Sequence, residues 1–186
     1  MGQAKSDLLM GQKTLLQHVV QVLRLAVDQI VIVRAPDQAL PFDDADIILA
    51  NDVVGDQGPL RGIQAGLLAL PNGVERVFLS ACDVPLLKLE LVTHLFSYSK
   101  NTQAVVPVIA GMPQPLTAVY ATKILSVVTE LLEKGERSVQ ALLRNIDAHF
   151  VSEDVVRQVD PFLVSFENAN TPEDYQRVLK LFKDMA

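Results

Sequence analysis

The chain has 186 residues, a length typical of one domain rather than two. Its apolar fraction of 49% and charged fraction of 20% are typical of a folded globular chain and exclude an intrinsically disordered one. The net charge is −6 and no run of Lys or Arg occurs, which argues against a nucleic-acid partner, because such a partner needs a basic stripe to neutralise its phosphates.

The first half of the chain alternates amphipathic stretches with short apolar runs. Apolar residues at helical spacing predict a helix over 14–26, with Thr14 as its cap. A second helix is expected over 60–70, after the polar loop 51–59. Three β-branched or apolar runs predict buried strands, and the third, which we expect to be central, contains no interrupting charge. The predicted strands are 29–34, 46–50 and 76–81.

The second half continues this alternation with one difference. Residues 104–111 and 113–120 predict two strands that are joined by a tight turn, and therefore one antiparallel strand. A last strand is expected within 162–170, and Pro172 is well placed in the first turn of a closing helix. Three further helices are expected over 88–99, 122–134 and 138–145.

Alternating strands and helices predict an α/β fold. We expect a three-layer sandwich, Rossmann-like, with a mostly parallel central sheet, helices on both faces and one antiparallel strand. No linker or repeat divides the chain, so residues 1–186 are expected to form a single domain. Ligands of such sheets bind at the carboxyl ends of the strands.

Cysteine content and hydropathy predict a location. Cys82 is the only cysteine, so no intrachain disulfide can form, which favours a reducing compartment. No apolar stretch approaches the roughly 20 residues that a membrane-spanning helix needs, and the N-terminus lacks a secretory signal. We therefore expect a cytoplasmic protein without a membrane partner.

A carboxylate follows the third predicted strand. In the segment ACDVP at 81–85, Asp83 comes directly after a buried run and Pro85 prevents the strand from continuing. A poorly solvated carboxylate needs a positive partner, and Mg²⁺ would serve, since it takes oxygen ligands from one or two carboxylates and from substrate phosphates. The alternative is structural, with Asp83 capping the next helix or fixing the turn.

The loop after the second predicted strand is rich in glycine. Asp52 ends that strand, and Gly55, Gly58 and Gly62 allow a ligand to approach the backbone closely. Pro59 then begins a helix whose unpaired N–H groups can receive a phosphate. An ordinary long loop with turn residues is the alternative.

Two asparagines precede the last helix. Asn168 and Asn170 are polar groups that could face a ligand, although Thr171 and Asp174 have capping-box spacing and account for the helix start without any function. Lys5 is the only cation among the first twelve residues, and a solvated surface lysine is its ordinary interpretation. The three histidines have no metal-ligand spacing.

Six segments stand out together, in order along the chain. They are MGQAKSDLLMGQKTLLQHV at the start, ND…GDQGPLRGI from 51, FLSACDVPLL from 78, QPLTAVY at 114–120, GERSVQALL at 135–143 and NANTPED at 168–174. In this order they resemble the molybdenum cofactor guanylyltransferase family, among the nucleotidyltransferases with a glycosyltransferase-A-like fold. The resemblance covers nearly the whole chain, and each segment alone is weak.

This resemblance implies Mg²⁺-dependent transfer of GMP from GTP to molybdopterin, with release of pyrophosphate. Lys5 and Asp83 would be catalytic, with Lys5 on the GTP phosphates and Asp83 on the metal, and Asp52 would help to hold the nucleotide. Gln114 and Pro115 would border the acceptor pocket. Asn168 and Asn170 would lie on the acceptor side of the catalytic face, near the metal or the second substrate. The resemblance also leaves room for protein partners from cofactor biosynthesis.

The chain departs from the family's pattern at its start. The family opens with an apolar strand and a glycine-rich phosphate loop before Met-Gly, whereas this sequence begins at Met1-Gly2. We therefore expect weak GTP binding, and rescue by roughly twenty upstream residues, a length estimated from typical strands and loops. Two other functions stay open: a nucleotidyltransferase that uses CTP or another nucleotide, and an inactive nucleotide-binding module.

Overall fold

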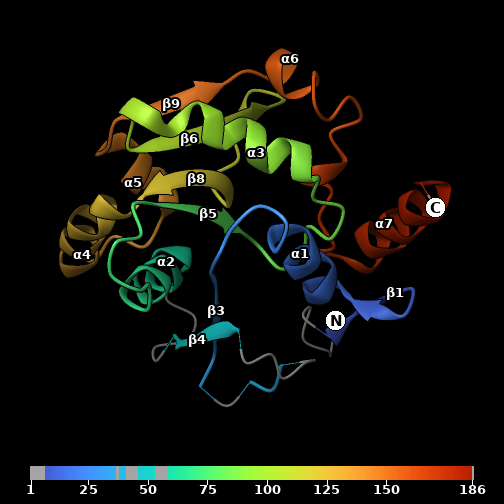
Figure 1. The fold of residues 1–186 in the computed structure, drawn as a ribbon, viewed down its shortest axis with the longest axis horizontal. Coiled ribbons are helices and arrows are strands. Elements are labelled where there is room, and N and C mark those ends of the chain that lie inside the picture. Colours follow the sequence, from blue (N-terminus) through green and yellow to red (C-terminus); the bar gives the residue numbers. More distant parts are fainter. Residues whose placement is uncertain (1–6, 37, 41–45, 53–57, 186) are drawn as a thin grey trace.

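The computed structural model describes residues 7–36, 38–40, 46–52 and 58–185, and the predicted phosphate contact Lys5 lies outside them. Figure 1 shows one group of strands among the helices and a smaller pair of strands at the lower edge of the molecule. The strands are β1 (Leu9–Met10), β2 (Lys13–Thr14), β3 (Ile30–Arg34), β4 (Ile47–Asn51), β5 (Arg76–Ser80), β6 (Ala104–Ile109), β7 (Met112–Pro113), β8 (Thr117–Ala121) and β9 (Ala148–Val151). The α-helices are α1 (Leu15–Leu23), α2 (Pro59–Leu68), α3 (Leu89–Ser97), α4 (Leu125–Glu133), α5 (Val139–Arg144), α6 (Glu153–Val156) and α7 (Pro172–Met185). Short 3₁₀ turns are η2 (Ser99–Asn101), η3 (Thr122–Ile124) and η4 (Val164–Phe166).

The largest sheet has the strand order β5-β8-β6-β7, with β9 on the other side of β6. The mixed α/β architecture is as predicted, but a mostly parallel sheet is not confirmed. Strand β8 is antiparallel to both β5 and β6, β7 is antiparallel to β6, and only β9 pairs in parallel with β6. The chain that leaves β6 turns back through β7 and β8, and β8 inserts between β5 and β6. Because β8 runs opposite to both of its neighbours, its pairings with β5 and with β6 are both antiparallel.

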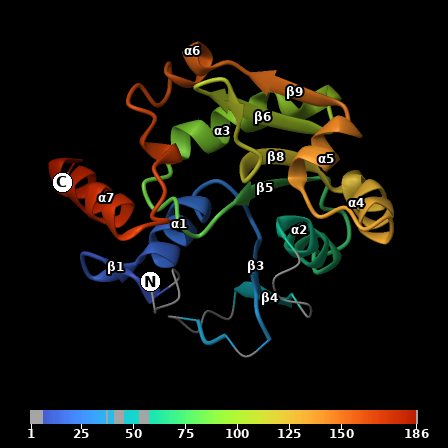
Figure 2. The same ribbon diagram turned by 180° about the vertical axis from the view of Figure 1, so that it is seen from behind.

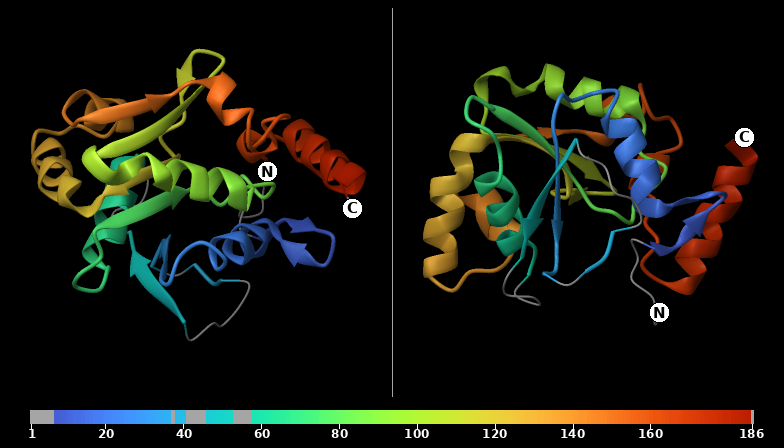
Figure 3. Two further views of the ribbon diagram at one scale, coloured as in Figure 1. Left: turned by 45° about the horizontal axis from the view of Figure 1, so that its top comes forward. Right: turned by 60° about the horizontal axis from the view of Figure 1, so that its bottom comes forward.

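Strands β3 and β4 form a separate parallel pair. Strand β5 lies at the end of the large sheet within the part of the chain that the structure describes, so the prediction that it is central was wrong there. Between β3, β5 and α2 lies a mainly apolar cavity of about 470 Å³. Figure 3 shows the β3–β4 pair set apart from the strands of the large sheet.

Helices cover both faces of the large sheet, as predicted. Alternate residues of a strand point to opposite faces, and this divides the core in two. Ala104, Val106 and Tyr120 pack against α2, α4 and α5 on one face, whereas Val105 and Val119 pack against α1 and α3 on the other. Helix α3 lies in front of the sheet in Figure 1, and α5 lies in front of it in the reverse view of Figure 2.

Local sequence explains where the helices begin. At the start of α1, Thr14 accepts a hydrogen bond from the N–H of Gln17, and the Gln17 side chain accepts one from the N–H of Thr14. This capping box confirms the predicted role of Thr14. Helix α2 begins after Gly58, whose φ of 82° and ψ of 167° are accessible to glycine and to few other residues.

The predicted last strand is wrong. Residues 162–170 contain the 3₁₀ turn η4 instead, and Leu163 before it is in the left-handed region with φ of 56°. The buried carboxylate of Asp160 accepts the N–H of Ser165 at 2.9 Å, which satisfies a backbone donor without any neighbouring strand. Strand β9 and helix α6, which the sequence did not predict, lie just before this segment.

The closing helix α7 begins at Pro172, as predicted. It packs beside the β1–β2 hairpin (Figure 3). There the hydroxyl of Tyr175 donates a hydrogen bond to the carbonyl oxygen of Leu9. Within the described residues, none of the helices combines the length and hydropathy that crossing a bilayer requires.

Candidate functional site

Asp83 lies in the loop between β5 and α3, where two other segments meet it. Before it, the N–H of Ala81 donates a hydrogen bond to the carbonyl oxygen of Leu116 at 3.1 Å. At Asp83 itself, the carbonyl oxygen accepts the N–H of Ala169 at 2.9 Å. The carboxyl end of β5 therefore joins the turn before β8 and the segment before α7, although the three are far apart in sequence.

The turn before β8 is held by its own backbone and by one phenol. The N–H of Gln114 donates to the carbonyl oxygen of Pro107 at 2.8 Å, and the N–H of Thr117 donates to that of Gln114 at 3.1 Å. The hydroxyl of Tyr120 donates to the carbonyl oxygen of Pro115 at 2.9 Å. Burial raises the pKa of the Tyr120 phenol well above its usual value, so this donor keeps its proton.

Contacts on both sides of Asn168 and Asn170 fix the segment before α7. Ala169 is fully buried in the core, so Asn168 and Asn170 flank a fixed point. Arg177 on α7 contacts Glu167 at 2.7 Å and Asp174 at 2.8 Å. The predicted capping box is present: the N–H of Asp174 donates to the Thr171 hydroxyl, and the N–H of Thr171 donates to the Asp174 carboxylate, both at 3.1 Å. Hydrogen bonds from Thr171, and then Arg177, hold the pKa of Asp174 below its usual value.

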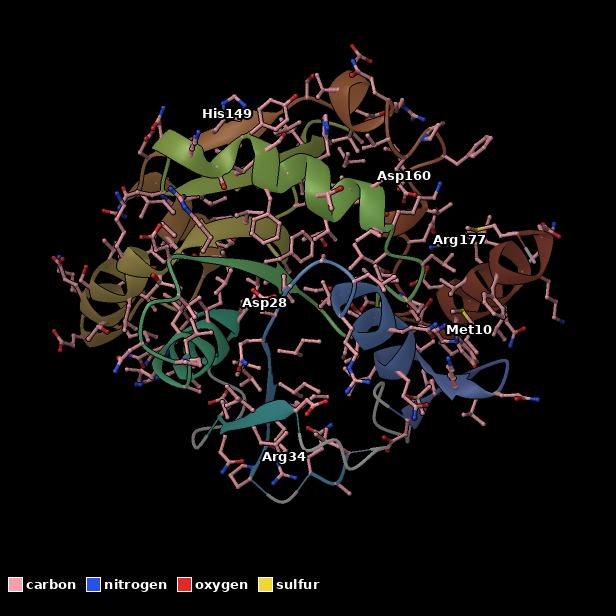
Figure 4. The ribbon with its side chains drawn as sticks, viewed as in Figure 1. Met10, Asp28, Arg34, His149, Asp160 and Arg177 are labelled. Atoms are coloured by element: carbon pink, nitrogen blue, oxygen red, sulfur yellow. The ribbon has the colours of Figure 1, made fainter. Side chains whose placement is uncertain are left out.

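Asp52 lies on the other sheet. Its N–H donates to the carbonyl oxygen of Arg34 at 2.8 Å, which continues the β3–β4 ladder by one step. Arg34 thus ends β3 and Asp52 follows β4 at the same end of this pair. Figure 4 shows Arg34 at the opposite end of β3 from Asp28. Asp83 follows β5 in the large sheet, and the apolar cavity lies between β5 and β3.

The sequence analysis did not identify two arginines, one of which pairs through its backbone with Asp52. Arg34 ends β3 and Arg61 lies in the first turn of α2, and the Nε–H group of each is buried without a hydrogen-bond partner among the residues that the structure describes. Guanidinium groups suit phosphates and carboxylates. Their position at a strand end and a helix start was a signal that could have identified both.

Comparison with known proteins identifies the family. The family described as "MobA-like NTP transferase domain" matches residues 1–154. The chain belongs to this family. It is 32% identical over 177 residues to the molybdenum cofactor guanylyltransferase of Desulfosudis oleivorans, a match that covers 95% of this chain and 86% of the relative. The predicted resemblance to molybdenum cofactor guanylyltransferases is thus confirmed, and the chain is a nucleotidyltransferase.

Solved structures have the same fold. Molybdopterin-guanine dinucleotide biosynthesis protein A from Archaeoglobus fulgidus superposes with a TM-score of 0.78 at 23% identity, covering 99% of this chain and 93% of that one. The Rv0371C protein of Mycobacterium tuberculosis, in a complex with manganese, superposes with a TM-score of 0.67 at 16% identity, covering 95% and 91%. At these identities the similarity establishes the fold alone.

The structure gathers some of the predicted site residues and separates others. Asp83 lies in the loop after β5, and this loop hydrogen-bonds to the turn that contains Gln114 and to the segment that contains Asn168 and Asn170. Asp52 stands apart from them on the β3–β4 pair. The predicted role of Lys5 concerns a residue outside those that the structure describes.

The donor groups at Asp83 suit a cation that is shared with a substrate. Across the described residues no group of three or more His, Cys, Asp or Glu side chains could enclose a metal ion. The segments around Asp83 instead offer one carboxylate and the amide oxygens of Asn168 and Asn170. Mg²⁺ commonly binds through one or two carboxylates plus substrate phosphates rather than in a cage made of protein alone, so these groups fit such an ion.

Proposed function

We propose that this protein transfers GMP from GTP to molybdopterin with release of pyrophosphate, in a reaction that requires Mg²⁺. The observation that carries the proposal is the meeting of three segments at Asp83 within a chain of this family. The Desulfosudis oleivorans relative is named for guanylyl transfer, and the Archaeoglobus fulgidus protein is named for molybdopterin-guanine dinucleotide biosynthesis.

The reaction joins two anions. An oxygen of the molybdopterin phosphate attacks the α-phosphorus of GTP, and the bond between the α-phosphorus and the bridging oxygen breaks as pyrophosphate leaves. The protein's main task is to position the two phosphates against their repulsion and to stabilise the charge that develops. When bound, a divalent ion supplies positive charge at the reacting phosphate oxygens.

Each site residue has a proposed role in this reaction. The Asp83 carboxylate holds the metal ion, and the asparagine amides, Asn168 and Asn170, orient groups on its other side. Gln114 borders the acceptor. Asp52 holds the nucleotide, and Lys5 contacts the GTP phosphates.

Two arginines extend the nucleotide side of this assignment. Because Arg34 pairs through its backbone with Asp52 and Arg61 lies in the first turn of α2, their guanidinium groups are suited to meet negative charge at the end of the β3–β4 pair. The single domain of residues 1–186 would then bind GTP across the two sheets, with α2 between them.

The choice of metal rests on the donor groups. A carboxylate with amide oxygens favours hard cations such as Mg²⁺ and Mn²⁺ over thiolate-seeking metals. The manganese complex of the Mycobacterium tuberculosis protein, which has the same fold, supports a divalent cation. Mg²⁺ is our proposal for the working ion.

The test measures pyrophosphate release from GTP in the presence of molybdopterin and Mg²⁺, with CTP and UTP in parallel. We expect turnover with GTP, dependence on molybdopterin, and loss of turnover with a chelator. Turnover with CTP alone would assign the chain to cytidylyl transfer. Nucleotide binding without turnover under any of these conditions would favour a binding module and contradict our proposal.

A further inference from the structure

One carboxylate far from Asp83 in sequence is fully buried. Asp160 has 0% exposed surface, and it is the only charged residue in the buried class among the residues that the structure describes. Moving an ionised carboxylate out of water is costly unless it is paired and hydrogen-bonded. The contacts of Asp160 therefore need an explanation that the proposed reaction does not supply.

Asp160 is linked to two residues that are also linked to each other. Its Oδ2 accepts the N–H of Ser165 at 2.9 Å, and its Oδ1 lies 3.4 Å from Nζ of Lys88. Within the described residues Oδ1 has no hydrogen bond, so the contact with Lys88 is an ion pair only. The N–H of Lys88 in turn donates to the hydroxyl of Ser165 at 3.0 Å. Asp160, Lys88 and Ser165 thus each contact the other two.

These contacts join the two segments that build the metal site. Lys88 ends the loop that contains Asp83, and Ser165 lies in the turn that leads to Asn168. At the other end of the same interface, the N–H of Ala169 donates to the carbonyl oxygen of Asp83. Between these two ends, Leu86 and the buried apolar residues Val164 and Ala169 share one cluster. Polar contacts therefore hold the interface at both ends, and apolar residues pack in its middle.

An apolar contact alone would fix this interface less closely. Hydrophobic attraction has no preferred direction, whereas hydrogen bonds and ion pairs do. Buried ion pairs often add little net stability compared with apolar residues of similar size. Figure 4 labels Asp160 on the side of the molecule that also carries Arg177.

We propose that Asp160 is a positioning residue: through Lys88 and Ser165 it fixes the 165–170 segment against the Asp83 loop, and so sets the geometry of the divalent-cation site. The proposal rests on the proposed function, because it takes Asp83 as the metal ligand. Residues that hold metal ligands in place commonly change metal affinity or activity by roughly 10-fold to 100-fold when replaced.

The test compares Mn²⁺ affinity, measured from the electron paramagnetic resonance signal of the unbound ion in the presence of GTP. Asp160→Asn keeps the shape of the side chain and removes its charge, and Ser165→Ala removes the acceptor of the Lys88 N–H without altering any charge. We expect both to weaken Mn²⁺ binding by about 10-fold. In steady-state assays kcat should fall more than the KM for GTP changes. Lys88→Arg, which keeps the positive charge, should retain most of the affinity.

Two controls separate positioning from stability. Glu130→Gln removes a carboxylate from an exposed ion pair with Lys134, and should leave Mn²⁺ affinity unchanged. Val128→Ala opens a cavity in the α4 core, a cluster separate from the one that contains Leu86, Val164 and Ala169, and should lower the melting temperature without weakening Mn²⁺ binding. Equal loss of affinity in Val128→Ala would attribute the effect to stability and overturn the proposal.

Asp83→Asn distinguishes the two proposals. If it weakens Mn²⁺ binding while Asp160→Asn and Ser165→Ala bind like the unsubstituted protein, Asp160 has no positioning role and the proposed function stands. If Asp83→Asn also binds Mn²⁺ normally, the metal site is elsewhere, and both proposals fail.

Discussion

The backbone N–H of Ala169 donates a 2.9 Å hydrogen bond to the carbonyl oxygen of Asp83. This bond places the backbone of the candidate metal ligand beside Ala169, which lies between Asn168 and Asn170 in the sequence. Because it involves only backbone atoms, substitutions of the Asp83 side chain can leave it intact. Asp83 is therefore a good position at which to test chemistry separately from folding.

Asp83→Asn should lower metal-dependent turnover by on the order of 100-fold or more, since it removes the negative charge that holds the cation against the phosphates. The melting temperature should change little. Turnover at a series of Mg²⁺ concentrations measures the effect, with the exposed Asp154→Asn as the matched control. Undiminished Mg²⁺-dependent turnover in Asp83→Asn would remove Asp83 from the mechanism.

Gly58→Ala should destabilise the protein. The φ and ψ of Gly58 lie in a region that costs other residues roughly 1–3 kcal/mol. An added Cβ would also lie 2.9 Å from the carbonyl oxygen of Arg137, which is backbone and cannot easily move aside. Gly73→Ala is the control, because Gly73 also has positive φ but its Cβ would meet nothing within 4 Å. Chemical denaturation should give the larger loss for Gly58→Ala, and equal losses would refute the steric argument.

Tyr120→Phe should leave the carbonyl oxygen of Pro115 without its donor, at a cost of about 1–3 kcal/mol for an unsatisfied buried group. The affected turn contains Gln114, so the KM for the acceptor should rise as well. Tyr98→Phe is the control, since Tyr98 is partly exposed and its hydroxyl lies 3.4 Å from His94. Thermal unfolding of both variants checks the prediction, which fails if the two lose the same stability.

Glu153 should contribute to stability in a pH-dependent way. Its carboxylate accepts the N–H of Ala110 and contacts Arg157, and these partners, Ala110 first, hold the pKa of Glu153 below its usual value. A lowered folded-state pKa means that the contribution is fully present above the unfolded pKa of about 4.3 and is lost as pH falls through the folded value.

Glu153→Gln should therefore be less stable than the parent protein at pH 7, and the difference should shrink below about pH 4.3. Urea unfolding from pH 7 to pH 3 measures it. The exposed Glu133→Gln serves as a control on α4. A difference that stays constant over this range would contradict the assigned contact.

Local sequence predicted most of the elements of this fold. Helical spacing and the Thr14 cap located α1, β-branched runs located β3 and β4, and Thr171 with Asp174 located the start of α7. These features depend on neighbours within a few residues, where periodicity and capping act. Asp83 at the end of β5, and its candidate chemistry, were likewise visible in the order of residues.

Only the tertiary structure decided how these elements pair and which polar groups meet. The position of β8 between β5 and β6 depends on which strand edges the folded chain brings together, a choice that residue patterns do not encode locally. The strand predicted over 162–170 failed for a related reason. Its backbone N–H groups donate to the nearby side chain of Asp160 and to the carbonyl oxygen of Asp83 in a distant loop, because a buried N–H can donate to any well-placed acceptor and not only to a neighbouring strand.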